Sequence, residues 1–178
     1  FSIIALLTWN AFLQGSVTTT LYGGALWWHM HEMLFAFVPA VIVGFLLTAV
    51  QTWTGVRSLH GKYLFVLLCI WLLARVTFFF PQLLSVWVIA TIDMLFLPLA
   101  AIALAKPIIK VKLWRNLMFI PILLIMAICN SVMHYAVITQ SPEMIINAST
   151  SMALLVTLVM CIMGGRVFPM FTANGTQT

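Results

Sequence analysis

The sequence predicts an all-α protein, a polytopic transmembrane helical bundle with about six membrane helices. Its 178 residues are 64% hydrophobic and only 6% charged, a composition that soluble domains of this size do not have. The apolar residues lie in long runs, and about 20 apolar residues in a helix are enough to cross a bilayer. Short polar turns separate the runs, which favours antiparallel neighbours in a single domain over residues 1–178.

Polar residues, glycine and proline mark the ends of the expected helices. A first apolar run covers residues 1–13, which is short for a span, and residues 14–24 are expected to form a loop. Because this run is short and the chain does not begin with Met, we expect a fragment of a longer protein. The other helices are expected at about residues 26–53, 61–80, 83–105, 113–138 and 144–163. Their ends are assigned to Gly55, Pro81, Lys106-Pro107 and Gly164-Gly165.

The basic residues indicate the orientation in the membrane. All but one of the eight Lys and Arg residues fall at one end of the expected bundle: Arg57, Lys62, Lys106, Lys110, Lys112, Arg115 and Arg166. Lys and Arg are concentrated in loops that stay in the cytoplasm. We therefore expect a bacterial inner-membrane protein with the C-terminus of this segment in the cytoplasm. The lipid bilayer is the expected partner, and the net charge of +5 does not point to nucleic acid.

The densest group of chemically active residues lies in residues 27–33, WWHMHEM, at the outer end of the second expected helix. Ionisable groups inside a membrane helix are costly, so they are candidates for a functional site. Helical spacing places His29 and Glu32 on one face and His31 roughly opposite, so the two histidines are not expected to ligate the same ion. Glu32 can orient a ligating imidazole through a hydrogen bond.

Three further ionisable residues are expected in the same half of the membrane. Arg75 and His134 lie near the outer ends of their helices, and Asp93 lies near the midplane. This convergence predicts one polar pocket open to the outside. The simplest interpretation of Arg75 and Asp93 is a structural ion pair between helices, and an alternative is that Arg75 holds a haem propionate.

Histidines on two helices can ligate a metal ion or a haem iron, so the candidate ligands are His29, His31 and His134. The competing interpretation is that each histidine is a structural hydrogen-bonding residue. His60 lies in a basic loop and is expected to be solvated. The three cysteines lie singly in apolar runs, which argues against a disulfide framework or a zinc site.

Several motifs resemble those of NnrS family proteins, whose signature reads HxHEMLFGF…GFLLTA…NWTG. The matching segments are 29–35 (HMHEMLF), 44–50 (GFLLTAV), 53–55 (WTG), 71–75 (WLLAR), 93–98 (DMLFLP) and 164–174 (GGRVFPMFTAN). Ala36 replaces the usual glycine after MLF, and Gln51-Thr52 replaces the usual residues before WTG.

The resemblance implies a polytopic protein of the bacterial inner membrane that is associated with haem and copper. It also implies a role in denitrification or in relief of nitric-oxide stress. The chain resembles about the N-terminal half of such a protein, so the remainder of the chain is an expected partner and can supply a further ligand. The family's histidines carry over onto His29, His31 and His134.

Three functional hypotheses remain open at this point, and the third is a structural subunit of a larger complex whose function does not depend on the histidines. The first is a haem-binding, and secondarily copper-binding, membrane protein that meets nitric oxide in the outer half of the bilayer. Catalysis would need an open iron position and an electron donor, and the sequence shows neither. The alternative is a transporter or metal-delivery protein, which would need polar residues between Asp93 and the cytoplasm. Only Asn10, Thr48 and Gln51 are candidates for such a path.

Overall fold

The computed structural model describes residues 2–16 and 20–176, and every regular element in those residues is a helix. The all-α prediction is therefore confirmed. The helices are α1 (Ser2–Leu13), α2 (Ala25–His31), the π-helix η1 (Glu32–Phe37), α3 (Val38–Thr54), α4 (Lys62–Thr77), α5 (Val86–Met94), α6 (Phe96–Lys110), the 3-10 helix η2 (Trp114–Asn116), α7 (Phe119–Thr139) and α8 (Pro142–Thr176).

Four helical stretches in the described residues are long and apolar enough to cross a membrane: Ala25–Thr54, Val86–Lys110, Trp114–Thr139 and Pro142–Arg166. The prediction of about six membrane helices is not confirmed. The helix α1 has 12 residues and α4 has 16, and both fall short of the roughly 20 residues that a span needs. The expected third helix ends early because the chain leaves the helix after Thr77 and turns before α5 begins.

Two helices continue past the residues that were expected to end them. The helix α6 runs through Pro107 to Lys110, and α8 runs through Gly164-Gly165 to Thr176. Glycine in a helix costs only about 1 kcal/mol relative to alanine. In a bilayer an interrupted helix would leave backbone groups without partners, which costs more. Gly55 does end α3 as expected, in the left-handed conformation with φ 65°.

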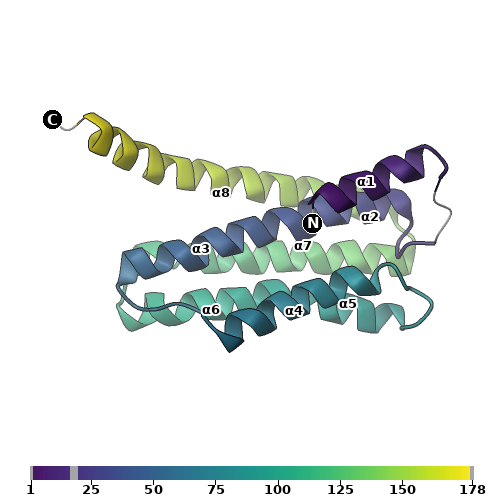
Figure 1. The fold of residues 1–178 in the computed structure, drawn as a ribbon, viewed down its shortest axis with the longest axis horizontal. Coiled ribbons are helices and arrows are strands. Elements are labelled where there is room, and N and C mark those ends of the chain that lie inside the picture. Colours follow the sequence, from purple (N-terminus) through teal and green to yellow (C-terminus); the bar gives the residue numbers. More distant parts are fainter. Residues whose placement is uncertain (1, 17–19, 177–178) are drawn as a thin grey trace.

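Figure 1 shows α3, α6 and α7 lying along a common direction. The helix α5 leads directly into α6 within the stretch Val86–Lys110, and α4 packs against both. The helix α8 packs on α7, and its C-terminal end lies away from the other helices. The ends of the long helices fall at two opposite ends of the bundle.

The interior is filled by apolar side chains with no solvent exposure, such as Val50, Leu104, Ile108 and Phe119. Small residues such as Ala100 also lie in this core and allow helices to approach closely. Between membrane helices, close packing and hydrogen bonds replace the hydrophobic effect as the main source of association. The bundle is therefore a rigid frame for the polar side chains that it encloses.

Candidate metal-binding site

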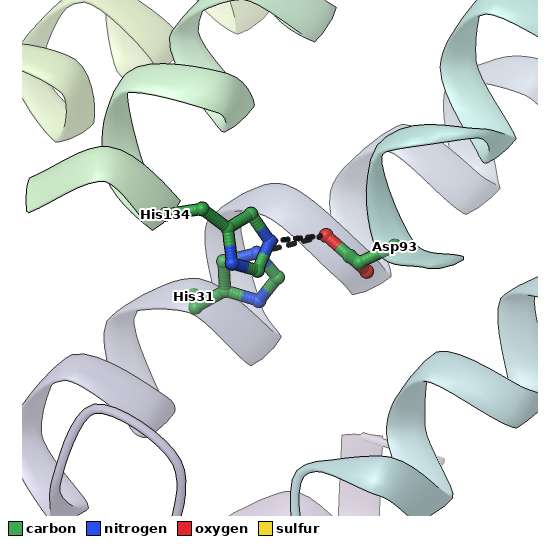
Figure 2. A group of neighbouring side chains, drawn as sticks. All are labelled: His31, Asp93 and His134. Atoms are coloured by element: carbon green, nitrogen blue, oxygen red, sulfur yellow. Dashed lines mark hydrogen bonds and ion pairs between the residues drawn. The ribbon is translucent and has the colours of Figure 1, made fainter. Parts of the chain in front are cut away.

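Three ionisable side chains from three helices meet inside the bundle. His31 comes from the end of α2, Asp93 from α5 and His134 from α7, as Figure 2 shows. One ligand atom from each lies within 4.8 Å of the others. The three residues are 0%, 6% and 1% exposed. All three residues were predicted from the sequence as members of a candidate site.

Asp93 is the centre of the cluster. Its Oδ2 atom accepts a hydrogen bond from His134 Nε2 at 3.0 Å and lies 3.2 Å from His31 Nε2. The other oxygen, Oδ1, pairs with Arg75 Nη2. The ion pair expected between Arg75 and Asp93 is thus present, and it links α4 to α5.

Asn130 is a member of the cluster that the sequence analysis missed. Its Nδ2 donates to Asp93 Oδ2 at 2.7 Å, and its Oδ1 lies 2.9 Å from His31 Nε2. Asn130 precedes His134 by four residues on α7, so the two side chains share one face of that helix. A buried amide one turn from a buried histidine is the signal that could have revealed it.

The π-helix η1 explains why His31 and Glu32 both point into the bundle. Sequence reasoning assumed a regular α-helix and placed Glu32 on the face of His29, and the structure corrects this assignment. Pro39 lies near the start of α3 and has no N–H to bond to the carbonyl of Phe35, with which its ring would clash. The widened π turn removes that conflict and shifts the direction of the preceding side chains.

Glu32 is the second buried carboxylate. Its Oε1 atom lies 3.0 Å from Arg75 Nε and 4.0 Å from His31 Nδ1, and the residue is 1% exposed. Oε2 has no hydrogen-bond partner among the described residues. With both carboxylates ionised and both imidazoles neutral, two negative charges face the single positive charge of Arg75. The cluster then carries one negative charge, which favours the binding of a cation.

Aromatic rings close the cluster. Trp27 stacks on His31 with ring centroids 4.6 Å apart, and Phe78 meets His31 edge-on at 5.1 Å. The Tyr22 hydroxyl is hydrogen-bonded to His134 Nδ1 at 3.2 Å. Burial raises the pKa of Tyr22, so this hydroxyl stays protonated at neutral pH. The expectation of a polar pocket open to the outside is wrong for the described residues, because these rings cover the polar groups.

His29 lies apart from this cluster. Its ring stacks on Trp9 of α1 with a centroid distance of 4.3 Å, and the side chain is half-buried. The structure thus separates His29 from His31, and a ligand role for His29 stays a prediction. His60 is exposed, and its Nδ1 lies 2.7 Å from the carbonyl oxygen of Ser58, which suits a loop residue.

The candidates for a polar path toward the basic end do not line the interior. Asn10, Thr48 and Gln51 are all exposed, and Thr48 and Gln51 bond to carbonyls of their own helix. Below the cluster the described core is apolar. It includes Leu104 and Ile108, both without exposure. The arrangement therefore favours a closed binding site over a conduction path.

These features define an all-helical protein with four helices able to cross a membrane and a buried His-Asp-His cluster that could hold a metal ion. The chain belongs to the NnrS family, because the family model described as NnrS protein matches residues 1–178. No curated protein and no solved structure matches the chain.

Proposed function

We propose that this chain is the metal-binding part of a bacterial inner-membrane protein that protects against nitric oxide, with one metal ion held by His31, Asp93 and His134. The observation that carries the proposal is the meeting of two imidazoles and a carboxylate within 4.8 Å, fully enclosed in the bundle. Burying three polar groups from three helices is expensive unless they bond to one another or to an ion.

Copper is the metal that we favour. Imidazole nitrogen suits copper, iron and zinc, and the affinity of such a site for divalent ions of the first row is highest for Cu²⁺. When Glu32 and Asp93 are both ionised, they outnumber the single positive charge of Arg75, which supports binding of a cation. A bound ion would share the Asp93 oxygen that the two imidazoles now share, at 3.0 and 3.2 Å.

The residues around the ligands support the change of tautomer that metal binding needs. When Nε2 of each histidine binds the ion, the remaining proton must lie on Nδ1. The Tyr22 hydroxyl lies 3.2 Å from Nδ1 of His134 and can accept from it as well as donate to it. Glu32 Oε1 lies 4.0 Å from Nδ1 of His31, within reach after a small side-chain shift. Tyr22 therefore orients His134 already, and Glu32 would orient His31 after that shift.

A haem does not fit between His31 and His134 in this arrangement. The two imidazoles would have to lie on opposite faces of the macrocycle. Their centroids are 5.2 Å apart, and both Nε2 atoms approach the same oxygen of Asp93. Trp27 and Phe78 fill the adjacent space. A haem, which the family resemblance implies, would then need another ligand, and we propose His29, whose ring stacks on Trp9 outside the closed cluster.

The role in nitric-oxide stress or denitrification rests on the family resemblance. Nitric oxide is small, apolar and soluble in the bilayer, so a site enclosed by membrane helices is accessible to it. The proposed orientation places the cluster in the outer half of the membrane and the C-terminus of this segment in the cytoplasm. It rests on the basic residues that gather at the opposite end.

The test is metal analysis with an absorbance spectrum of the full-length protein purified in detergent from cells supplied with copper and haem. We expect near-stoichiometric copper in the wild type and its loss in His31→Ala and His134→Ala. His60→Ala is the matched control and should keep its copper. Loss of a Soret band in His29→Ala alone would support the haem assignment. Copper-free wild-type protein, or copper retained in both cluster variants, would sink the proposed site.

A further inference from the structure

The opposite end of the bundle holds a polar cavity, which the proposed function does not use. It has a volume of about 510 Å³ and lies where α3, η2 and α8 meet. Arg115, Asn116 and Arg166 provide its polar lining, and Trp53 provides an aromatic wall. These residues lie at the ends of three of the four candidate spans, Ala25–Thr54, Trp114–Thr139 and Pro142–Arg166. The cavity is therefore at the depth of the lipid headgroups.

The guanidinium of Arg166 is held in place by hydrogen bonds that occupy only some of its N–H donors. Its Nη1 donates to Asn116 Oδ1 at 2.7 Å, and Nη2 makes a longer contact of 3.4 Å to the carbonyl oxygen of Arg115. The group also lies over the ring of Phe119, 5.3 Å from its centroid. A guanidinium has five N–H donors, so donors remain for a ligand in the described surroundings.

No carboxylate balances the two arginines. The chain has three acidic residues, and Glu32 and Asp93 are committed to the buried cluster at the other end. Glu143 begins α8, whereas Arg166 lies 23 residues further along that helix, about 35 Å away. Arg115 is exposed and has no side-chain partner among the described residues. Two like charges beside one cavity therefore lack a counter-charge from the residues that the structure describes.

We propose that this cavity binds the phosphate of an anionic membrane lipid. Planar guanidinium groups match the oxygens of a phosphate diester and can bind them with paired hydrogen bonds. Basic pockets between membrane helices suit anionic headgroups. The apolar groove between α3 and α8, lined by residues such as Ile42, Phe45 and Met160, gives an acyl chain a surface along the same two helices.

The test is native mass spectrometry of the full-length protein in a neutral detergent, titrated with phosphatidylglycerol, phosphatidylcholine of the same acyl chains, or inorganic phosphate. We expect saturable binding of phosphatidylglycerol only. Arg115→Gln and Arg166→Gln should each weaken it about fivefold or more. Arg166→Lys should restore part of the loss, because it keeps the charge without the fork of donors.

Arg57→Gln is the matched control, because it removes one positive charge at the same end, and Arg57 lines a different cavity. It should bind phosphatidylglycerol as the wild type does. Equal weakening in Arg57→Gln would overturn the site in favour of general surface charge. Binding of inorganic phosphate that competes with the lipid would overturn the lipid assignment. Because Arg166 also bonds to Asn116, melting curves without lipid check its folding, and the exposed Arg115 carries the test if Arg166→Gln unfolds.

Discussion

At one end of the bundle Arg75 lies between Glu32 and Asp93, and all three are nearly inaccessible to solvent. At the other end Arg115 and Arg166 line an open cavity with no carboxylate from the described chain nearby. At the first end the charged groups contact one another and not solvent, so they depend on one another and on the fold. The second end leaves charge uncompensated where water or a headgroup can reach it. The same residue type therefore stabilises the fold at one end and is available for binding at the other.

Of the variants that test this comparison, removal of Asp93 should lower the free energy of unfolding most. In Asp93→Ala, Arg75 loses its hydrogen-bonded carboxylate, and His134 and Asn130 lose their shared acceptor. We expect a loss of about 3–5 kcal/mol in the free energy of unfolding, together with loss of bound metal. Thermal or denaturant unfolding in detergent measures the first effect. Asp93→Asn keeps the shape of the side chain, so its free energy of unfolding should lie between those of the wild type and Asp93→Ala. If Asp93→Ala melted like the wild type, the dependence of the fold on Asp93 would be refuted.

Tyr22→Phe should separate stability from metal binding at the same end. The variant loses one hydrogen bond to His134, which should lower the free energy of unfolding by about 1 kcal/mol. Groups that orient a ligating histidine typically contribute about tenfold or more to metal affinity, so copper binding should weaken by that factor. Competition with a chelator measures it. Tyr63→Phe is the control, because Tyr63 is 62% exposed, and equal weakening there would contradict the role of Tyr22.

Glu32→Gln should cost less stability than Asp93→Asn. Glu32 approaches Arg75 Nε at 3.0 Å without hydrogen-bond geometry, and its second oxygen has no partner among the described residues. Neutralising it relieves a buried charge while Arg75 keeps Asp93. We expect a change of within about 1 kcal/mol in the free energy of unfolding. A larger loss of free energy of unfolding in Glu32→Gln than in Asp93→Asn would show that Glu32 contributes more to stability than Asp93.

The basic end should give the smallest change in stability. Arg115 is exposed, and Arg115→Gln removes none of the side-chain hydrogen bonds that the structure describes. We expect the free energy of unfolding in neutral detergent to stay within about 0.5 kcal/mol of the wild type. If Arg115→Gln lowered the free energy of unfolding as much as Tyr22→Phe, the two ends would not differ in their contribution to stability.

The sequence predicted most of the ionisable residues in the cluster but not how their side chains are arranged. The depths of Arg75, Asp93 and His134 follow from counting residues along apolar runs, and the ion pair follows from the cost of burying charge. Asn130 was not singled out, because a neutral amide is noticed only through its spacing of one helical turn from His134. The role of Tyr22 depends on how its loop folds back, with its N–H bonded to the carbonyl oxygen of Phe78 at 3.1 Å.

The errors in helix boundaries have two physical causes. Pro107 is buried in the bundle, where no water is present to bond to freed backbone groups, so α6 continues through it. Gly164-Gly165 lie at the end of a candidate span, and glycine in a helix costs only about 1 kcal/mol relative to alanine, so α8 continues there too. The prediction of about six spans is not confirmed for a different reason. The run at residues 1–13 is itself short for a span, and the helix in the run at residues 61–80 has only 16 residues.

The six residues of η1 lie within one long helical stretch, and their wider turn changes the direction of the side chains before it relative to those after it. Each residue of an α-helix advances the side-chain direction by about 100°. Deletion of one residue between Glu32 and Phe37 would therefore turn the imidazole of His31 away from Asp93. It would also set the ring of Pro39 against a backbone carbonyl one turn earlier, which the π turn now avoids. The length of this short segment sets which way the histidine points, and Pro39 favours that length.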